Sequence, residues 1–368
     1  MKKNKNYVDL KDQPVPEGQH LLEVDDLKMY FHTEDGVVRA VDGVSYTLDR
    51  GETLGVVGES GSGKSVTAMT IMGLISMPPG KIEGGDVRYR GRSILEMTEE
   101  EMQHIRGNDI AMIFQDPMTS LNPVYKIGKQ VGEGLRLHRG YSKQEALKRA
   151  TELLDLVGIP EPEKRVNEYP HQFSGGMRQR VMIAMALACD PDILIADEPT
   201  TALDVTIQAQ IIELMQEMQE KNGNAIIMIT HDLGVVADMA DKIMVMYAGR
   251  PVEFGTAEEI FYESRHPYTW GLIRSIPEQA IEEKKPLTPI HGNPPSLMNL
   301  PEGCVFSPRC PYATDKCRKQ RPERVVTESG HYSACHYSGD PDFLKNAPET
   351  SRTRKDSKTV SYTHLRAH

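Results

Sequence analysis

The sequence predicts an α/β fold in which a parallel sheet carries a phosphate-binding loop and a small cysteine-rich C-terminal appendage follows. Two short apolar runs, 193–196 and 225–229, have the composition of buried parallel strands, and a helical stretch separates them. A third predicted strand, 53–57, leads into a glycine-rich loop and then a helix from about 64 to 75. This alternation of strands and helices indicates a parallel sheet with helices on its faces.

The composition limits the classes of function. The chain has 368 residues, which suggests two domains or one large domain with an appendage. No run approaches the ~20 apolar residues of a membrane-spanning helix. The net charge of -10 argues against bulk binding to nucleic acid. No apolar segment follows the basic start, so we expect no secretory signal and a cytosolic compartment, where structural disulfides are rare.

The remaining elements follow from hydrophobic periodicity. Alternating apolar residues favour strands, and the interval before residue 190 has mostly helical spacing. The further predicted strands are 21–24, 27–32, 44–48, 110–114, 242–247 and 250–254, and the further predicted helices are about 127–138, 143–157 and 205–220.

The glycine-rich loop matches a phosphate-binding motif. Residues 58–65 read Gly-Glu-Ser-Gly-Ser-Gly-Lys-Ser, which fits G-x-x-x-x-G-K-[ST]. Glycines let the backbone approach phosphate oxygens, and the N–H groups at the helix start form an anion-binding nest. Lys64 would reach the β- and γ-phosphates, and Ser65 would hold Mg²⁺. The residues expected to contact the nucleotide here are Gly58, Ser60, Gly61, Ser62, Gly63, Lys64 and Ser65.

Two acidic residues complete such a site. The apolar strand 193–196 is followed directly by Asp197 and Glu198. Asp197 would hold Mg²⁺ through water, and Glu198 is placed to polarise the attacking water as a general base. An acidic turn after a core strand is common, so the pair indicates a nucleotide site only in combination with the phosphate-binding loop.

Spacing narrows the kind of nucleotide-binding protein. Lys64 and Asp197 are 133 residues apart, further than in a small GTPase or a nucleoside kinase, and a largely helical insertion at about 123–189 fills the interval. Small residues at 174–176 precede a helix, which predicts a second anion-binding helix N-terminus. One chain cannot easily bring both helix ends to one phosphate, whereas two chains arranged head to tail can.

Residues 21–275 resemble the nucleotide-binding subunit of an ABC transporter in the order and spacing of motifs. Phe173 stands where leucine is common in the family signature. The residues that match the signature are Ser174, Gly175, Gly176 and Met177, the last where glutamine is common. The resemblance implies a P-loop NTPase fold with a RecA-like parallel sheet core, an antiparallel β subdomain and a helical subdomain that carries the signature.

Other motifs of the family have counterparts. Gln115 resembles the Q-loop glutamine, which implies contact with Mg²⁺ and with the membrane partner. Asp204 resembles the D-loop aspartate that crosses to the opposite subunit, and His231 resembles the switch histidine at the γ-phosphate. Phe31 falls where the family places the ring that stacks on adenine. Tyr30 is the alternative, because strand alternation lets only one of the two face the base.

The resemblance implies an ATPase that sandwiches ATP between the phosphate loop of one subunit and the signature of another. Glu198 would polarise water and His231 would contact the γ-phosphate, with Lys64 and Gln115 as further catalytic residues. The implied Mg²⁺ ligands are Ser65, Gln115 and Asp197.

Four of the five cysteines lie between residues 304 and 335, and this cluster predicts a metal site. Four thiolates suit structural zinc or an iron–sulfur cluster, and this spacing lacks the paired C-x2-4-C knuckles of zinc ribbons. The segment that begins His-Pro-Tyr-Thr at His266 resembles the C-terminal region of oligopeptide, dipeptide and nickel import ATPases, which implies a [4Fe-4S] cluster, with Zn²⁺ or no metal as alternatives. Cys189 reads as an ordinary buried thiol. The candidate ligands are Cys304, Cys310, Cys317 and Cys335.

The resemblance implies an ATPase that energises import of oligopeptides or dipeptides. Its partners would be two transmembrane permease subunits, a second related ATPase and an extracytoplasmic peptide-binding protein, with no nucleic acid. It would sit peripherally on the cytoplasmic face of the membrane. Import of nickel or another small solute is one alternative, and a soluble ABC ATPase without a transport role is another.

These patterns give the expected domain boundaries. A lead-in at 1–20 precedes the nucleotide-binding domain at 21–275, and a proline-rich connector with the cysteine cluster occupies 276–340. A polar, disordered tail is expected at 341–368, and its last part, 361–368, looks like an unrelated assembly scar.

Overall fold

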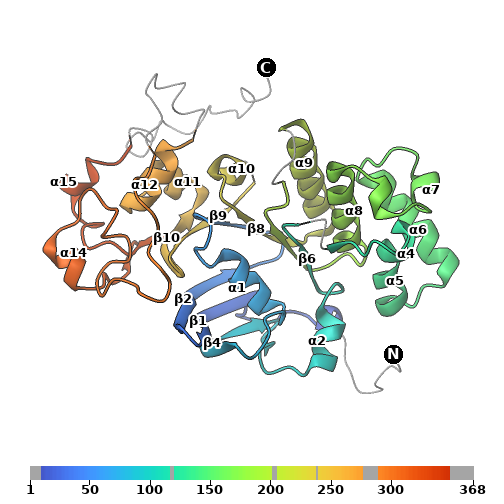
Figure 1. Ribbon diagram of the computed structural model, residues 1–368, viewed down its shortest axis with the longest axis horizontal. Coiled ribbons are helices and arrows are strands. Elements are labelled where there is room, and N and C mark those ends of the chain that lie inside the picture. Colours follow the sequence, from blue (N-terminus) through green and yellow to red (C-terminus); the bar gives the residue numbers. More distant parts are fainter. Residues whose placement is uncertain (1–9, 117–119, 201–204, 238, 277–288, 349–368) are drawn as a thin grey trace.

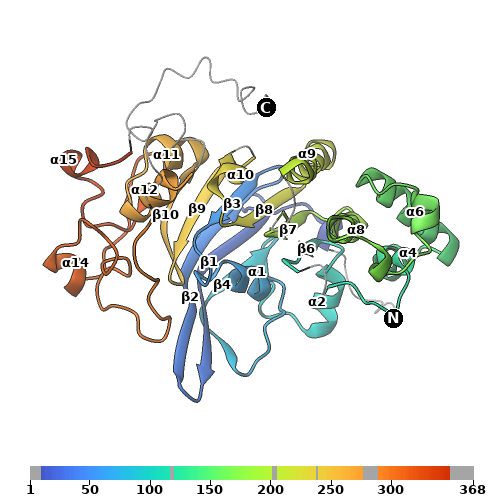
Figure 2. The same ribbon diagram turned by 45° about the horizontal axis from the view of Figure 1, so that its top comes forward.

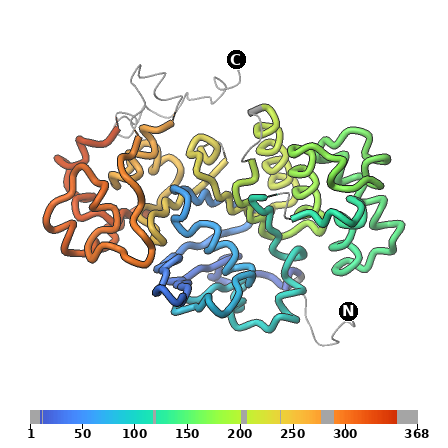
Figure 3. The backbone as a smooth tube through the Cα atoms, viewed as in Figure 1, coloured from blue at the N-terminus to red at the C-terminus, as the bar shows by residue number. Residues whose placement is uncertain are grey.

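The computed structural model describes residues 10–116, 120–200, 205–237, 239–276 and 289–348 (Figure 1). These residues form an eight-stranded sheet, a four-stranded sheet, a helical region and a C-terminal segment. In Figure 3 the helical region and the C-terminal segment lie at opposite ends of the molecule, with the two sheets between them. Within the described ranges, no helix combines the length and apolar composition needed to cross a bilayer.

The centre of the larger sheet is parallel, as the apolar runs predict. Its strand order is β11-β12-β10-β9-β3-β8-β7-β6, and Figure 2 shows the part from β10 to β6. The parallel strands are β3 (Thr53–Val57), β6 (Ile110–Ile113), β7 (Ile193–Asp197), β8 (Ala225–Thr230) and β9 (Lys242–Tyr247). Val57 of β3 lies opposite Thr230 of β8, and Asp197 of β7 lies opposite Ile229 of β8. The carboxyl ends of three neighbouring strands are therefore level, and the residues that follow them emerge at one edge.

Both faces of the parallel strands are covered by helices. Ile193 and Ile195 belong to the apolar cluster that includes Ile71 of α1 (Lys64–Ile71), whereas Leu194 packs in the cluster that includes Met215 of α9 (Val205–Asn222). Successive residues of a strand point to opposite faces. A strand buried on both faces must therefore be apolar throughout, which explains why these runs do not alternate.

The smaller sheet is antiparallel and has the order β2-β1-β4-β5. The separate strands predicted at 21–24 and 27–32 form one strand with an irregular register near Asp26, whose φ of 43° is left-handed. The irregularity explains why the pattern looked like two strands. The members of this sheet are β1 (Leu22–Thr33), β2 (Gly36–Leu48), β4 (Gly80–Tyr89) and β5 (Arg92–Ser93).

A helical region fills the predicted insertion. The helix expected at 127–138 is broken at Gly132, and the next one begins with a capping box in which Ser142 and Glu145 bond reciprocally. The helices of this region are α4 (Ile127–Val131), α5 (Glu133–His138), α6 (Lys143–Leu156), α7 (Pro162–Arg165) and α8 (Gly175–Leu187). The other α-helices within the described residues are α2 (Glu99–Ile105), α10 (Leu233–Ala237), α11 (Ala257–Tyr262), α12 (Pro267–Arg274), α14 (Asp315–Lys319) and α15 (Pro341–Leu344).

The C-terminal segment joins the core sheet, so the separate appendage expected from the sequence is not confirmed. β10 (Arg250–Thr256) runs antiparallel to β9 and pairs on its other side with β12 (Tyr332–Ser333), which pairs with β11 (Val325–Val326). The structure also describes residues 341–348, where a disordered tail was expected. Phe343 of α15 contacts the rings of Trp270 and Tyr337. Residues 349–368 lie outside the described part.

Candidate nucleotide-binding site

The phosphate-binding loop connects β3 to α1, as the motif predicts. Gly63 caps α1 with a left-handed φ of 99°, and a Cβ at this position would lie 2.2 Å from the carbonyl oxygen of Ala40. A Cβ at Gly58 would lie 2.2 Å from the carbonyl oxygen of Met246. Neighbouring backbone therefore crosses both ends of the loop so closely that only glycine fits.

The lysine of the motif lies folded over this loop. The Lys64 Nζ donates hydrogen bonds to the carbonyl oxygens of Gly58 at 2.7 Å and Glu59 at 3.0 Å. Burial lowers the pKa of Lys64, while the nearby carboxylates of Glu198 and Asp197 raise it. The negative charges of these carboxylates favour the protonated form of Lys64, and this positively charged form is the one that attracts a polyphosphate.

One polar atom in the loop is left without a partner. The hydroxyl oxygen of Ser62 is buried and makes no hydrogen bond within the described residues. Buried polar atoms normally have partners, so an orphaned hydroxyl at a helix start fits an oxyanion ligand such as phosphate. Ser62 was among the residues that the motif predicted to contact nucleotide.

The expected Mg²⁺ ligands meet next to the loop. The Ser65 hydroxyl donates to Asp197 Oδ1 at 3.0 Å, which joins the start of α1 to the end of β7. Burial raises the pKa of Asp197, and the hydrogen bond from Ser65 opposes that shift. A hydroxyl and a carboxylate are the oxygen ligands that Mg²⁺ takes in nucleotide sites, so this pair fits the cation.

Glu198 holds together the residues expected to act on the γ-phosphate. Gln115 Nε2 donates to Glu198 Oε2 at 2.9 Å, and His231 Nδ1 lies 3.3 Å from Glu198 Oε1. The backbone at Glu198 is left-handed with φ of 47°, and its N–H donates to the carbonyl of Ile229 at 2.8 Å. A non-glycine residue in this region marks local strain, which is common at active sites. The turn directs the carboxylate toward Gln115 and His231.

The aromatic residues near the expected adenine position differ in their roles. The Tyr30 hydroxyl donates to Asp42 Oδ1 at 2.9 Å, and burial raises the pKa of Tyr30 to about 12. Phe31 is half-buried and lies opposite Val38 in the β1–β2 pair. Tyr30 is therefore engaged in a structural hydrogen bond, and Phe31 remains the predicted adenine contact.

The signature segment lies apart from the phosphate loop of the same chain. Ser174 caps α8 by accepting a hydrogen bond from the N–H of Met177 at 3.3 Å, and both Ser174 and Gly175 are exposed. In Figures 1 and 2, α8 lies on the other side of β6 from α1. The predicted contact of Gly176 with nucleotide is therefore not made to this chain's own loop. The D-loop residue Asp204 lies outside the described residues.

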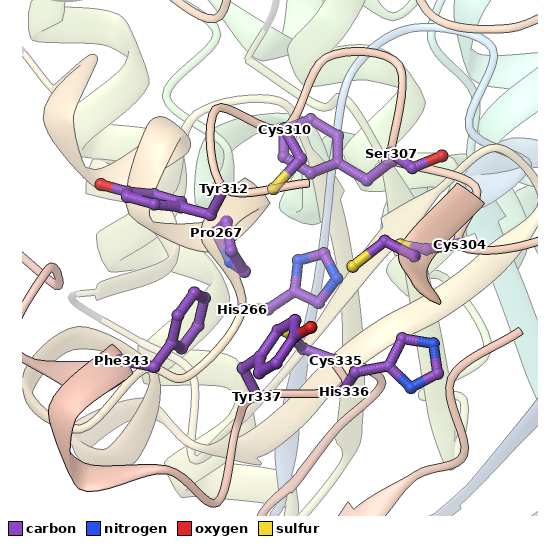
Figure 4. A pocket seen from close by; sticks show the side chains of 12 residues that line it. His266, Pro267, Cys304, Ser307, Cys310, Tyr312, Cys335, His336, Tyr337 and Phe343 are labelled. Atoms are coloured by element: carbon purple, nitrogen blue, oxygen red, sulfur yellow. The ribbon is translucent and has the colours of Figure 1, made fainter. Parts of the chain in front are cut away.

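The four clustered cysteines line one pocket in the C-terminal segment (Figure 4). The backbone of Phe306, Tyr312 and Tyr337 lowers the pKa of the thiols of Cys304, Cys310 and Cys335 respectively. Burial nevertheless raises the pKa of all three thiols, to about 11 for Cys310 and about 12 for Cys335. Across the described ranges, no group of three or more His, Cys, Asp or Glu side chains is arranged to hold a single metal ion. The expected metal is thus not confirmed.

Comparisons with known proteins agree with this geometry. Residues 41–201 match the family described as ABC transporter, and residues 252–317 match the family described as oligopeptide/dipeptide transporter, C-terminal region. The chain is 58% identical over 312 residues to the oligopeptide transport ATP-binding protein OppD of Bacillus subtilis, covering 85% of this chain and 87% of that protein. The chain belongs to the ABC transporter ATP-binding family.

Further relatives of this ABC ATPase share most of its length. It is 52% identical over 320 residues to the dipeptide transport ATP-binding protein DppD of Escherichia coli, covering 87% of this chain and 97% of that one. The dimeric post-hydrolysis structure of the ATP-binding cassette MJ0796 with ADP and Pi matches with a TM-score of 0.59 and 29% identity. That match covers 64% of this chain and 98% of the other.

Sequence reasoning missed two residues that hold the phosphate loop of this ABC ATPase. The Tyr268 hydroxyl accepts a hydrogen bond from the N–H of Glu59 at 2.8 Å, and Arg309 forms an ion pair with the Glu59 carboxylate. Tyr268 belongs to the His-Pro-Tyr-Thr run, whose family resemblance does not indicate a contact with the phosphate loop. Arg309 is 250 residues from Glu59 and has no local signal.

The close backbone at Gly63 gives a test of the site. Gly63→Ala is expected to weaken MgATP binding by about 100-fold or more, or about 3 kcal/mol, because the loop must shift to relieve the contact with Ala40. Isothermal titration calorimetry would measure this loss. Gly51→Ala is the matched control, since Gly51 also has a left-handed φ of 72° but has no atom within 4 Å of its Cβ position. Equal affinity in both variants would contradict the account.

Proposed function

We propose that this ABC ATPase hydrolyses ATP to drive import of oligopeptides or dipeptides through a membrane permease. The observation that carries the proposal is the contact of Glu198 with Gln115 and His231, next to the Ser65–Asp197 pair and the phosphate loop. The names of the relatives, oligopeptide and dipeptide transport ATP-binding proteins, support peptides as the transported class.

The residues of the loop bind and orient the triphosphate. Lys64 lies within reach of the β- and γ-phosphates when its ammonium leaves the carbonyl oxygens of the loop, and Ser62 offers its free hydroxyl. Ser65 and Asp197 would hold Mg²⁺, which offsets charge on the phosphate oxygens. Together these groups fix the γ-phosphate at the carboxyl edge of the sheet, where catalysis is mostly positioning and electrostatic stabilisation.

Glu198 is the proposed general base. Its carboxylate accepts a hydrogen bond from Gln115 on one oxygen and faces His231 on the other, so it is held where it can contact a water that attacks the γ-phosphate. The water would give a proton to Glu198 as its oxygen bonds to the γ-phosphorus, while the bond from phosphorus to the bridging oxygen breaks and ADP leaves. His231 then contacts the γ-phosphate oxygens as charge develops there.

Closure of the site requires a second ATPase chain. The exposed N-terminus of α8, capped by Ser174, lies apart from the chain's own loop and would present its first N–H groups to a phosphate on another subunit. The dimeric arrangement of the related cassette MJ0796 supports pairing of this kind. We therefore propose a heterodimer with a related ATPase, seated on the cytoplasmic face of two permease subunits that receive peptide from an extracytoplasmic binding protein.

Replacing the proposed base separates binding from chemistry. Glu198→Gln is expected to lower the rate of ATP hydrolysis by about 100-fold or more, because an amide cannot accept the proton of the attacking water. MgATP affinity should stay within about threefold of the wild-type value, since the loop is unchanged. A coupled phosphate-release assay and calorimetry would measure the two quantities. Glu217→Gln, at an exposed position on α9, is the control, and sustained hydrolysis by Glu198→Gln would exclude this role.

The cysteine pocket supports a second proposal, a [4Fe-4S] cluster. The backbone contacts that lower the pKa of Cys304, Cys310 and Cys335 favour thiolates, and hydrogen bonds to sulfur are typical of such clusters. Burial raises the pKa of these thiols, so thiolates are favoured only together with a bound cation. The four cysteines that line this pocket match in number the thiolates that such a cluster takes.

Metal analysis decides this second proposal. Wild-type protein purified without oxygen should contain iron and absorb visible light, and Cys310→Ser should lose most of both, because one of the four ligands is removed. Cys189→Ser is the control, since Cys189 is buried outside the pocket. A colourless, iron-free wild-type protein would contradict the cluster, and zinc found in its place would favour the alternative metal.

A further inference from the structure

The C-terminal segment holds one residue of the phosphate loop by its side chain. Arg309 Nη1 and Nη2 lie 2.5 and 2.9 Å from the two carboxylate oxygens of Glu59. This fork-to-carboxylate geometry gives two parallel charge-assisted hydrogen bonds. The Arg309 side chain is 4% exposed and that of Glu59 is 29% exposed, so the pair is largely shielded from water. Ion pairs of this kind are screened less by salt than exposed ones.

Arg309 is fixed independently of Glu59. Its Nε donates to the carbonyl of His291 at 3.0 Å, and Nη2 donates to the carbonyl of Ile290 at 3.2 Å. Nη1 also lies 3.3 Å from the hydroxyl of Tyr247. These three contacts orient the guanidinium before it meets the carboxylate. Arg309 therefore acts as the anchor, and the loop residue is what it restrains.

A second contact restrains the backbone of the same residue. The Glu59 N–H donates to the hydroxyl of Tyr268 at 2.8 Å. Tyr268 is fully buried, with its ring 4.6 Å from that of Tyr247 and 5.3 Å from that of Phe306. The Tyr268 ring cannot turn without disturbing its packing against these two rings. Glu59 is thus held by its side chain and by its main chain from one C-terminal unit.

The position of Glu59 makes this restraint important for nucleotide. It is the one acidic residue in the loop 58–65, and its carbonyl accepts a hydrogen bond from Lys64. A free carboxylate there would repel the triphosphate and compete with it for the Lys64 ammonium. The ion pair with Arg309 neutralises that charge.

We propose that Arg309 and Tyr268 are positioning residues of the nucleotide site, which act by holding Glu59 in place and neutralising its carboxylate. The inference rests on the proposed ATP site and adds the C-terminal segment to it. Arg309 directly precedes Cys310, and Phe306 lines the cysteine pocket. The stretch that carries two of the four cysteines is therefore the same stretch that holds the phosphate loop.

Paired substitutions test the inference. Binding of the fluorescent analogue TNP-ATP with Mg²⁺ is measured for Arg309→Ala, Glu59→Gln and the double variant, and KM and kcat for ATP are measured for each in complex with the partner ATPase. Arg309→Ala is expected to raise the dissociation constant and KM about tenfold with a smaller change in kcat, because the freed carboxylate opposes nucleotide. The double variant should return to within about threefold of the wild type, because the opposing charge is gone.

Controls separate this role from support of the fold. Arg318→Ala, which breaks an exposed ion pair with Asp315 in the same segment, should bind like the wild type. Should Arg309→Ala not fold, Tyr268→Phe removes only the hydroxyl and is expected to weaken binding about threefold.

Each outcome has a distinct meaning. A double variant as weak as Arg309→Ala would overturn the inference, because loss of the opposing charge would then restore nothing. Unchanged binding in both Arg309→Ala and Tyr268→Phe would overturn it as well. Failure of the wild-type protein to bind Mg–TNP-ATP would instead overturn the proposed function.

Discussion

The level carboxyl ends of β3, β7 and β8 are the constraint on which the site depends. The parallel register places Val57 opposite Thr230 and Asp197 opposite Ile229, so the next residues along each strand leave the sheet together. Gly58 opens the phosphate loop, Glu198 follows Asp197, and His231 follows β8. A shift of one residue in either pairing would turn the side chains to the opposite face and separate these groups. The apolar strands therefore position the residues of the site as well as forming the core.

The buried charges at this edge of the sheet partly offset one another, and their arrangement does not maximise the stability of the fold. Lys64 and Asp197 are both buried, burial shifts each pKa toward the neutral form, and each charge partly offsets the other. Such burial opposes folding but prepares charges for a polyphosphate and its cation. The restraint of Glu59 by Arg309 belongs to the same balance, because it keeps an additional negative charge from reaching the phosphates. The C-terminal segment is consequently part of the electrostatic design of the site.

Local patterns predicted those parts that depend on local physics. The phosphate loop, the apolar strands and the acidic pair at Asp197 were predicted, because glycine conformation and burial leave marks within a few residues. The strands β11 and β12 are two residues each, too short for any periodicity, so their addition to β10 could not be foreseen. The Glu59–Arg309 pair joins residues far apart in sequence, and either residue alone looks like an ordinary surface charge. Such contacts depend on tertiary packing, which no short stretch of the sequence reveals.

The central claim is that one sheet edge places Glu198 beside the γ-phosphate of bound ATP. An experimental structure of the chain with its partner ATPase and the Mg²⁺ complex of a non-hydrolysable ATP analogue would measure this directly. The account predicts a Glu198 carboxylate within about 5 Å of the γ-phosphorus, with room for one water between them. It also predicts that Lys64 contacts phosphate oxygens. A carboxylate more than about 8 Å away in the closed complex would contradict the account, because no single water could then bridge base and phosphate.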